Sequence, residues 1–501
     1  MIKTDILVIG GGLSGRRCAE AASKNADVLL ICDGMGASPY VHGINIPLYP
    51  EDSVECFIND TLESGKFQND KRLVEVLCRE SVKLEKEFSF DKKDGEYNLL
   101  RPLGSTYPRV AGINSATGVN IINQINKDKK FTELNHVRAM NLDVSDKKVQ
   151  GAYCFDKKEE KWFYISAKAI VLAGGGYSGI FPFSTNSPDI GGDMIAMAYN
   201  AGVTLRDMEF IQFEPTAAVY PPSLKGKSVI TTMLFEGAVM KNKDGERFIK
   251  GSEQINKDEL SKNIYDEILK GKGTKNGGIY FDATKVPGNF IKEQYYTYFK
   301  RYMDVGIDIT KEPMEIAPAP HTTLGGIVID EKCRTNIEGL FACGESTGGL
   351  HGANRLGGNA GLEILIFGTV AGKSAAEYIK TAENTAKEKE VSANISYNCK
   401  KLDDEIGKIV TKSLNVIRNE ADMKDGIECL EQIIKEIGNF EFCYNKLLTY
   451  NKALCALISL KCAMMRKESI GCHTRSDSIK ENEKYTITVS KNCGINKEVI
   501  R

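Results

Sequence analysis

The 501-residue sequence has almost no excess of charge of either sign and no long apolar run. Lys and Arg total 66 against 67 Asp and Glu, which gives a formal net charge of -1 at pH 7. Without a basic surplus, neither nucleic acid nor an anionic membrane surface is an expected partner. No run of about 18 apolar residues occurs, which predicts no integral membrane segment. The sequence opens on MIKTDILVIG, a strand pattern without a charged-then-apolar leader, so we expect a cytoplasmic protein.

Metal-binding cysteine patterns and histidines are also scarce. The 14 cysteines are scattered, with no C-x-x-C pair, so we predict no iron–sulfur cluster and no bound metal, and reduced thiols that serve packing. Only five histidines occur, and His42, His321, His351 and His473 lie beside glycine-rich motifs. This distribution favours a role in a binding or active site over packing in the core. For each histidine taken by itself, an ordinary buried position is the alternative. His136 is expected to be structural.

Glycines, by contrast, are plentiful, and the first cluster indicates a dinucleotide site. Residues 5–10 (DILVIG) form a short, apolar, β-rich run, and GGLSGRRCAEAA follows with helical composition. Gly10, Gly12 and Gly15 give the G-x-G-x-x-G spacing, in which the backbone turns tightly and a pyrophosphate lies at a helix N-terminus. A second strand, ADVLLIC, ends at Asp33, where a carboxylate accepts hydrogen bonds from an adenosine ribose. The pattern alone does not separate NAD from FAD.

Motifs along nearly the whole chain carry a resemblance to a known family. In order they are GGGLSG, LAGGG, TNSPDIGGDMIAMAYNAG, DMEFIQFEPT, KDGERF, IYFDAT, PHTTLGGI, GLFACGEST, HGANRLGGNAG and KESIGCHTRSD. The sequence resembles the flavoproteins of fumarate reductase and succinate dehydrogenase, a family that includes L-aspartate oxidase. The resemblance implies an α/β fold: a Rossmann-like FAD-binding domain split by an α+β capping domain, with a helical C-terminal domain. The expected boundaries are 1–212 and 319–380 for the FAD-binding domain, 213–318 for the cap and 381–501 for the helical domain.

By the same resemblance the cofactor is FAD. Glu345 is expected to hold its second ribose, while the residues from Asn359 begin a helix that points at the isoalloxazine and stabilises its reduced anionic form. Respiratory members attach FAD to a histidine whose position falls at about Gly36 here, so FAD is predicted to be noncovalent. The expected cofactor contacts are Gly10, Gly12, Leu13, Ser14, Gly15, Asp33, Ser38, Gly43, Gly174, Asp193, Glu345, Asn359, Gly361 and Leu362.

The resemblance also implies a carboxylate site. Family members hold a dicarboxylate at both ends beneath the flavin, and a hydride passes between its C–C bond and flavin N5. One carboxylate is held by the histidine of H-T-T-x-G-G and the arginine of H-G-A-N-R-L-G, here His321 and Arg355. A guanidinium matches a planar carboxylate through two parallel hydrogen bonds. We expect Arg355 to bind a substrate carboxylate, with a flavin phosphate or a structural ion pair as the alternative. His42 is expected to pack or to face the flavin.

The residues expected at the other end of the substrate depart from the family pattern. Q-F-H-P-T reads Q-F-E-P-T, so Glu214 replaces a hydrogen-bond donor, and T-E-G reads F-E-G, so Phe235 replaces a hydroxyl beside the retained Glu236. The Arg-Asp pair whose arginine protonates the substrate reads Lys-Asp, beginning at Lys257; a lysine can also transfer a proton. Lys262 is a second candidate, and a solvated helix surface is the alternative for Lys257.

The loss of these hydrogen-bond donors predicts a substrate with one carboxylate, whose other end carries a group other than the second carboxylate of a dicarboxylate. Glu214 suits an amine, imidazole or hydroxyl there, and Phe235 suits an aromatic or apolar body. The leading hypothesis is hydride transfer from flavin N5 to the C=C bond of an α,β-unsaturated carboxylate other than fumarate. Alternatives are fumarate reductase or succinate dehydrogenase proper, oxidation of an amino acid as in L-aspartate oxidase, and a non-catalytic flavin electron-transfer subunit. The expected partners are a small carboxylic acid and a soluble electron-donor protein. The proposed catalytic residues are Lys257, Arg355, His321, Glu236 and Glu214.

Overall fold

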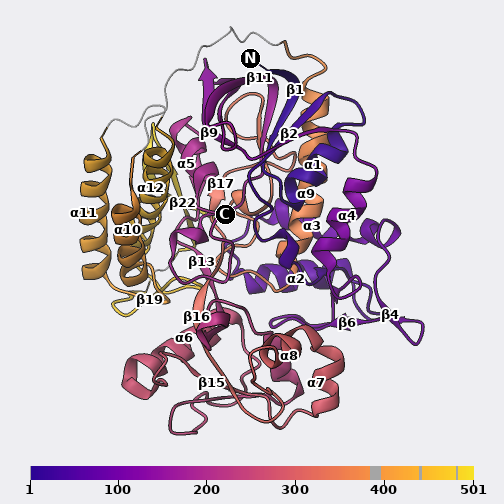
Figure 1. Cartoon of the computed structure of the whole chain (residues 1–501), viewed down its shortest axis with the longest axis vertical. Coiled ribbons are helices and arrows are strands. Elements are labelled where there is room, and N and C mark those ends of the chain that lie inside the picture. The colour runs from indigo at the N-terminus through magenta and orange to yellow at the C-terminus, as the bar shows by residue number, and fades with distance from the viewer. Residues whose placement is uncertain (1, 384–396, 439–442, 481–482, 501) are drawn as a thin grey trace.

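A seven-stranded sheet organises the first body of the chain in the computed structural model, which describes residues 2–383, 397–438, 443–480 and 483–500 (Figure 1). The strand order is β8 (Thr132–Asn135), β2 (Val28–Cys32), β1 (Ile2–Ile9), β11 (Lys161–Leu172), β10 (Lys148–Asp156) and β9 (Val137–Ser145), and β18 (Leu340–Ala342) also pairs with β11. Strands β8, β2, β1, β11 and β18 run parallel, whereas β10 and β9 are antiparallel. The apolar runs read from the sequence are these central strands, buried on both faces.

Two helices from opposite ends of this body pack closely together. Helix α1 (Leu13–Ala22) follows β1 directly, and α9 (Asn359–Tyr378) follows the return of the chain to the sheet at β18. Glycines allow the close contact, because a Cβ on Gly368 would lie 2.7 Å from the carbonyl oxygen of Ser14 and one on Gly372 would lie 2.3 Å from that of Cys18. The helix N-termini therefore lie beside the same edge of the sheet.

The cap is a separate layer, at the bottom of Figure 1. Strands β13 (Ile211–Tyr220) and β16 (Met314–Thr323) pair antiparallel and connect it to the body, and β15 (Ile279–Asp282) and β14 (Val239–Lys241) complete its sheet. Helices α6 (Lys257–Glu267), α7 (Gly288–Gln294) and α8 (Tyr296–Met303) pack on this sheet. Its buried residues, among them Phe281 and Ile264, form a cluster apart from the main core.

The C-terminal region is not purely helical. Helices α10 (Lys400–Ser413), α11 (Glu420–Ile437) and α12 (Tyr444–Met465) do pack together. After them, β21 (Tyr485–Ser490) and β22 (Gly494–Val499) form a hairpin that extends a sheet with β12 (Leu205–Arg206) and β17 (Gly326–Ile327). The expectation of helices over 381–501 is thus wrong for this hairpin, where alternating β-branched residues in YTITVS match a strand. Residues 384–396 of that range lie outside the described part of the chain.

Helix α12 is the one described helix that is long and apolar enough to cross a membrane. Of the 18-residue window that qualifies, 72% is buried inside the protein, which is the environment of a core helix.

The remaining elements are short and connect these layers: α2 (Val54–Ser64), α3 (Lys71–Ser81), α4 (Thr117–Lys127), α5 (Asp193–Asn200), β3 (Ile44–Asn45), β4 (Lys92–Lys93), β5 (Glu96–Tyr97), β6 (Leu99–Leu100), β7 (Val110–Ala111), β19 (Ile417–Arg418) and β20 (Thr474–Arg475).

Candidate active site

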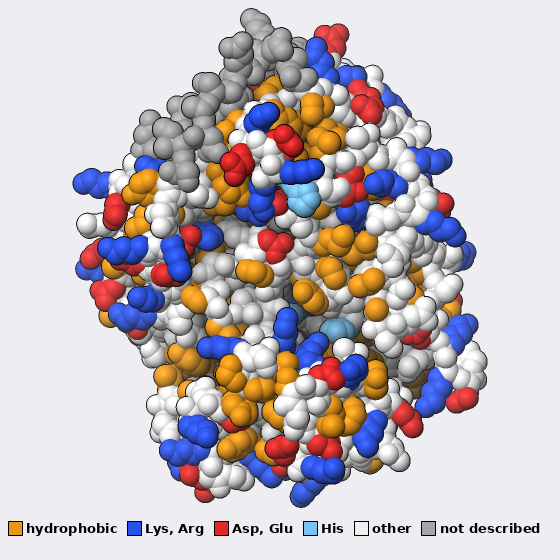
Figure 2. Space-filling model, viewed as in Figure 1, with side chains coloured by type: hydrophobic (Ala, Val, Ile, Leu, Met, Phe, Trp, Pro, Cys, Tyr) orange, Lys and Arg blue, Asp and Glu red, His pale blue; other side chains and the backbone are white. Residues whose placement is uncertain are grey.

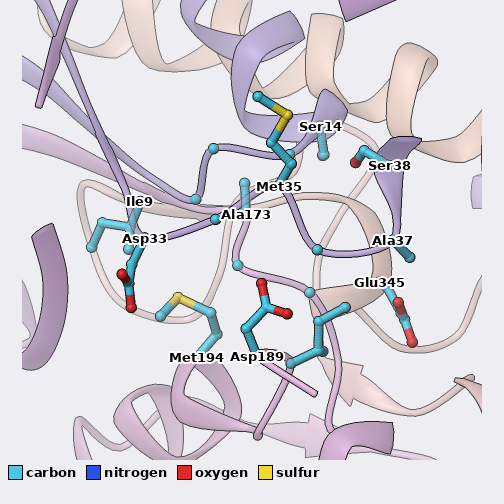
Figure 3. Close-up of a pocket in the computed structure, with 18 of the residues that line it drawn as sticks. Ile9, Ser14, Asp33, Met35, Ala37, Ser38, Ala173, Asp189, Met194 and Glu345 are labelled. Atoms are coloured by element: carbon cyan, nitrogen blue, oxygen red, sulfur yellow. The ribbon is translucent and has the colours of Figure 1, made fainter. Parts of the chain in front are cut away.

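A glycine-lined pocket opens at the carboxyl ends of β1, β2 and β11, at the N-terminus of α1 (Figure 3). Gly10 turns the chain with φ of +126°, and a Cβ there would lie 2.3 Å from the carbonyl oxygen of Ala173. Gly12 precedes α1, whose first turn carries no acidic residue. Ser38 approaches from the next loop, where its Oγ accepts a hydrogen bond from Leu13 N at 2.8 Å. Bare backbone at a helix N-terminus fits the pyrophosphate of a dinucleotide.

At one end of this pocket lies an acidic side chain, Asp33, that already forms ion pairs with basic residues. Asp33 follows β2 and lines the pocket, and its carboxylate accepts hydrogen bonds from Arg138 Nε at 2.8 Å and Lys157 Nζ at 2.9 Å. Arg138 also reaches Asp193 at the start of α5, 3.4 Å away, and Asn451 of α12 donates to Asp193 at 2.9 Å. A carboxylate has about four acceptor positions, so Asp33 retains room for a ribose hydroxyl.

The other end of the pocket leads to Glu345, which Figure 3 shows across from Asp33. Glu345 is held by the backbone N–H of Thr323 at 3.0 Å and more weakly by Asn186 at 3.4 Å. Burial raises the pKa of its carboxyl group, against the hydrogen bond from Thr323. Glu345 also lines a second, larger cleft, so the two cavities share a wall. An extended cofactor lying across both would pass this residue.

Most of the other residues expected to contact the cofactor lie near these two cavities. Asn359 begins α9, but its side chain is engaged with Asn45 at 2.7 Å and Thr61 at 3.2 Å. A Cβ on Gly361 would lie 2.9 Å from the carbonyl oxygen of Gly43, which lines the cleft. Ser14 and Gly174 line the glycine-lined pocket, whereas Leu13, Gly15 and Leu362 are buried in the first turns of α1 and α9 and line neither cavity.

We expect Gly12→Val to weaken FAD binding about 10- to 100-fold, because overpacking costs about 1–3 kcal/mol. Gly12 has ordinary φ and ψ of -70° and 178°, but a Cβ there would lie only 2.9 Å from Ser38 Oγ, so the larger side chain crowds the loop that lines this pocket. Titration of the apoprotein with FAD by flavin fluorescence measures this effect. Equal thermal unfolding midpoints of the two apoproteins are the control, and unchanged affinity would contradict a phosphate site here.

The second cleft lies between the body and the cap, where Figure 2 shows a hollow containing Lys or Arg and His side chains. Its volume is about 1940 Å³, part of it open to solvent. Ala37, Val41, Thr322 and Ala360 line both cavities, in addition to Glu345. The body contributes His321 and Arg355 to the cleft, and the cap contributes Lys257. Residues far apart in the sequence therefore face one enclosed space.

Arg355 is a buried cation in this cleft. It is 5% exposed, its NH1 donates to the carbonyl of Leu356 at 3.3 Å, and its Nε has no hydrogen-bond partner among the described residues. Burial lowers the pKa of its guanidinium. Gln212 of β13 fixes the backbone, since its amide donates to the Arg355 carbonyl at 2.9 Å. A buried guanidinium with an unused donor is prepared for an anionic ligand.

His321 lies on β16 and is neutral at physiological pH. Burial lowers its pKa to about 3, with Lys257 and Arg355 acting in the same direction and Glu214 opposing them. Its Nδ1 lies 2.8 Å from the Oγ1 of Thr185. When Thr185 donates this hydrogen bond, the proton of the imidazole is on Nε2, and the ring acts as a hydrogen-bond donor on the cleft side.

Glu214 and Lys257 form an ion pair across the cleft wall. Glu214 is fully packed within β13, where Thr216 also donates to it at 3.1 Å. Burial alone would raise the pKa of its carboxyl group, but Lys257 and His321 hold it below its usual range. Lys257 begins α6 and lines the cleft, whereas Lys262 is exposed on the outer side of that helix. Glu214, which the sequence analysis matched to an amine, imidazole or hydroxyl of the substrate, is thus paired with Lys257 in this structure.

Two expected residues lie away from the cleft. Phe235 packs beside the cap core with its ring under the guanidinium of Arg101, 6.0 Å away, and Glu236 ends the same short 3₁₀ helix (Thr231–Glu236). Neither is among the described residues that line the cleft, so the structure does not bring them to the substrate position. Sequence reasoning missed Tyr298 of α8, whose hydroxyl lies 3.1 Å from Nε2 of His42 in the cleft. The aromatic run YYTYF was the available signal.

The fold and the two connected cavities define a class, namely a capped oxidoreductase that binds a dinucleotide at the carboxyl edge of a Rossmann-like sheet. The FAD binding domain family matches residues 5–360, and the fumarate reductase flavoprotein C-terminal family matches residues 403–493. The chain belongs to the family of FAD-dependent oxidoreductases that contains fumarate reductase and L-aspartate oxidase, and FAD is its cofactor.

Similar proteins match this chain over nearly its full length. An uncharacterised FAD-dependent oxidoreductase of Methanocaldococcus jannaschii is 35% identical, covering 97% of this chain and 95% of the relative. A fumarate reductase (CoM/CoB) subunit of Methanothermobacter marburgensis is 32% identical, covering 95% of each. L-aspartate oxidase of Vibrio cholerae is 31% identical, covering 94% and 95%. The structure of a quinol-fumarate reductase with menaquinol superposes with a TM-score of 0.89 at 25% identity, covering 100% of this chain and 98% of that one.

Proposed function

We propose that this enzyme reduces the C=C bond of an α,β-unsaturated acid that carries one carboxylate and is not fumarate. The main support for this proposal is the charge of the side chains that line the cleft. Arg355 has no ion-pair partner among the described residues, whereas the charge of Lys257 is neutralised by Glu214. One uncompensated cation matches one carboxylate. A second carboxylate would be left without a partner, which is costly in a buried site.

Each residue has a role in this proposal. Arg355 and the Nε2–H of neutral His321 hold the substrate carboxylate and polarise the adjoining double bond. The chemistry that bound FAD supplies is two-electron transfer, as a hydride to one alkene carbon, and an external reductant returns the two electrons. Lys257 gives a proton to the other alkene carbon, so the double bond gains one hydride and one proton. The ionised Glu214 stabilises the ammonium form of Lys257 between turnovers.

Three further features belong to the proposal. FAD is noncovalent, because the position of the family's histidine tether falls at about Gly36, which lines the pocket without a side chain. The electron donor is a separate soluble protein, and the enzyme works in the cytoplasm. Oxidation of an amino acid is less well supported, since its ammonium group would compete with Lys257 for Glu214.

The test is anaerobic reoxidation of the dithionite-reduced holoenzyme, followed by the return of flavin absorbance. We expect crotonate, a monocarboxylic enoate, to reoxidise the flavin at least about 10-fold faster than fumarate, because an unpaired buried charge costs more than 1.4 kcal/mol. The same assay run in reverse uses oxidised enzyme and L-aspartate, where we expect no bleaching. Fastest reoxidation by fumarate, or bleaching by an amino acid, would overturn the proposal.

A further inference from the structure

We propose that the substrate is a 3-aryl-2-enoate, an acrylic acid whose β-carbon carries a planar aromatic ring. This inference rests on the proposed function and assigns the part of the substrate that the carboxylate site leaves unspecified. Its basis is an aromatic wall formed by His42, Tyr295 and Tyr298, all of which line the cleft. His42 comes from the body and the two tyrosines from the cap, so the wall spans the boundary between them.

The aromatic wall is held in place by contacts of its own. His42 Nε2 and the Tyr298 hydroxyl lie 3.1 Å apart, with ring centroids separated by 5.7 Å and an interplanar angle of 42°. The guanidinium of Arg301 lies over the Tyr298 ring at 5.3 Å and donates to the carbonyl of Ser228 at 2.9 Å. Tyr298 is only 5% exposed, whereas the His42 side chain is open to the cleft. The open aromatic surface of the wall is therefore the His42 ring, since Tyr295 and Tyr298 are only 3% and 5% exposed.

The aromatic wall is uncharged at neutral pH. Partial burial lowers the pKa of His42, and Arg301 and Lys257 lower it further, against an opposing effect of Glu214. Burial raises the pKa of the Tyr298 hydroxyl, so it stays protonated. The wall itself thus offers no cation to a second carboxylate. Two acids, Asp91 and Glu293, line the same cleft and would repel one.

An aromatic ring satisfies these constraints better than an alkyl group. Aromatic pairs with offset or tilted geometry at about 4.5–7 Å gain stability beyond their buried area, and an alkyl chain does not. A ring on the β-carbon is conjugated with the double bond and hence coplanar with it, which lets Arg355 and the aromatic wall engage one flat molecule from both ends.

The test compares trans-cinnamate, crotonate and fumarate as oxidants of the dithionite-reduced holoenzyme. We expect cinnamate to give kcat/KM at least about 10-fold above crotonate, a difference typical of a specific pocket contact. Equal or better turnover of crotonate would overturn the aryl assignment while leaving the proposed function standing. Fumarate as the best oxidant, or no reoxidation by any of the three, would overturn the proposed function and the aryl assignment together.

Variants of the aromatic wall separate recognition from folding. His42→Leu should raise KM for cinnamate at least about 10-fold and leave KM for crotonate within about 2-fold, because the open ring of the wall is lost. Phe299→Leu, on α8 and outside the cleft lining, is the control and should change neither value. Should His42→Leu fail to fold, Tyr298→Phe removes only the hydroxyl that contacts His42 and should raise KM for cinnamate alone by a smaller factor. Equal effects on both acids would overturn the assignment.

Discussion

Arg355→Gln should lower kcat/KM for unsaturated acids about 100- to 1000-fold, equivalent to ~3–4 kcal/mol, while FAD stays bound. Removing one partner of a buried charged contact costs about 2–5 kcal/mol, and here the bound carboxylate would be the group left unpaired. Arg355 does not line the glycine-lined pocket that fits the pyrophosphate, so the purified variant should retain its FAD. Steady-state kinetics with dithionite-reduced enzyme measures the effect, which we expect mainly in KM.

Arg101→Gln is the matched control for this prediction. Arg101 is an arginine of the same region whose Nε donates to the carbonyl of Ser105 at 2.9 Å and whose guanidinium lies over Phe235, outside the cleft lining. Its loss removes a positive charge without touching the carboxylate site. Turnover within about 2-fold of the unmodified enzyme is expected, as for most surface substitutions. Equal losses in the two variants would mean that Arg355 acts through general electrostatics, and unchanged turnover in Arg355→Gln would refute its role.

Lys257→Met should lower kcat about 100- to 10,000-fold with little change in KM, which is the range for loss of a general acid. The single variant leaves Glu214 as a buried carboxylate without its cation, so the informative comparison is the double variant Lys257→Met with Glu214→Gln. If Lys257 supplies the proton, the double variant remains slow although the buried charge is gone. Recovery of kcat in the double variant would instead assign Lys257 a purely charge-balancing role.

Two controls sharpen this result. Lys262→Met, on the exposed side of α6, should retain full kcat. Lys257→Arg should keep more of kcat than Lys257→Met, because it retains a cationic N–H donor at this position. The pKa of about 3 for His321 means that this ring does not titrate above pH 5, so it contributes no acid limb there.

The sequence predicted the cofactor half of the site better than the substrate half. Glycine spacing and strand patterns describe local backbone, so Gly10, Gly12 and Asp33 were expected at the pocket they line. The pairing of Glu214 with Lys257 joins residues 43 positions apart and follows only from the packing of α6 on β13. No local pattern encodes such a contact, so the sequence did not predict this ion pair.

The same limit explains the other differences. Phe235 and Glu236 lie on a short 3₁₀ helix that is capped by Gly237 with φ of 102°. Phe235 packs against the cap core and Glu236 is exposed, so neither lines the cleft. The β21–β22 hairpin was assigned to helices because the resemblance implied a helical domain over residues 381–501. The alternation in YTITVS is a local strand signal that this domain-level assignment did not use.

The two strands that join the cap to the body are also the strands on which the substrate residues sit. Gln212 and Glu214 lie on β13, and His321 lies on β16, within a ladder interrupted by register shifts. Lys257 is carried further out, on α6. In the proposed mechanism these strands therefore carry part of the carboxylate site and, through the ion pair of Glu214 with Lys257, also hold the proton donor. A change in the angle between cap and body at these strands would then move the two sites together.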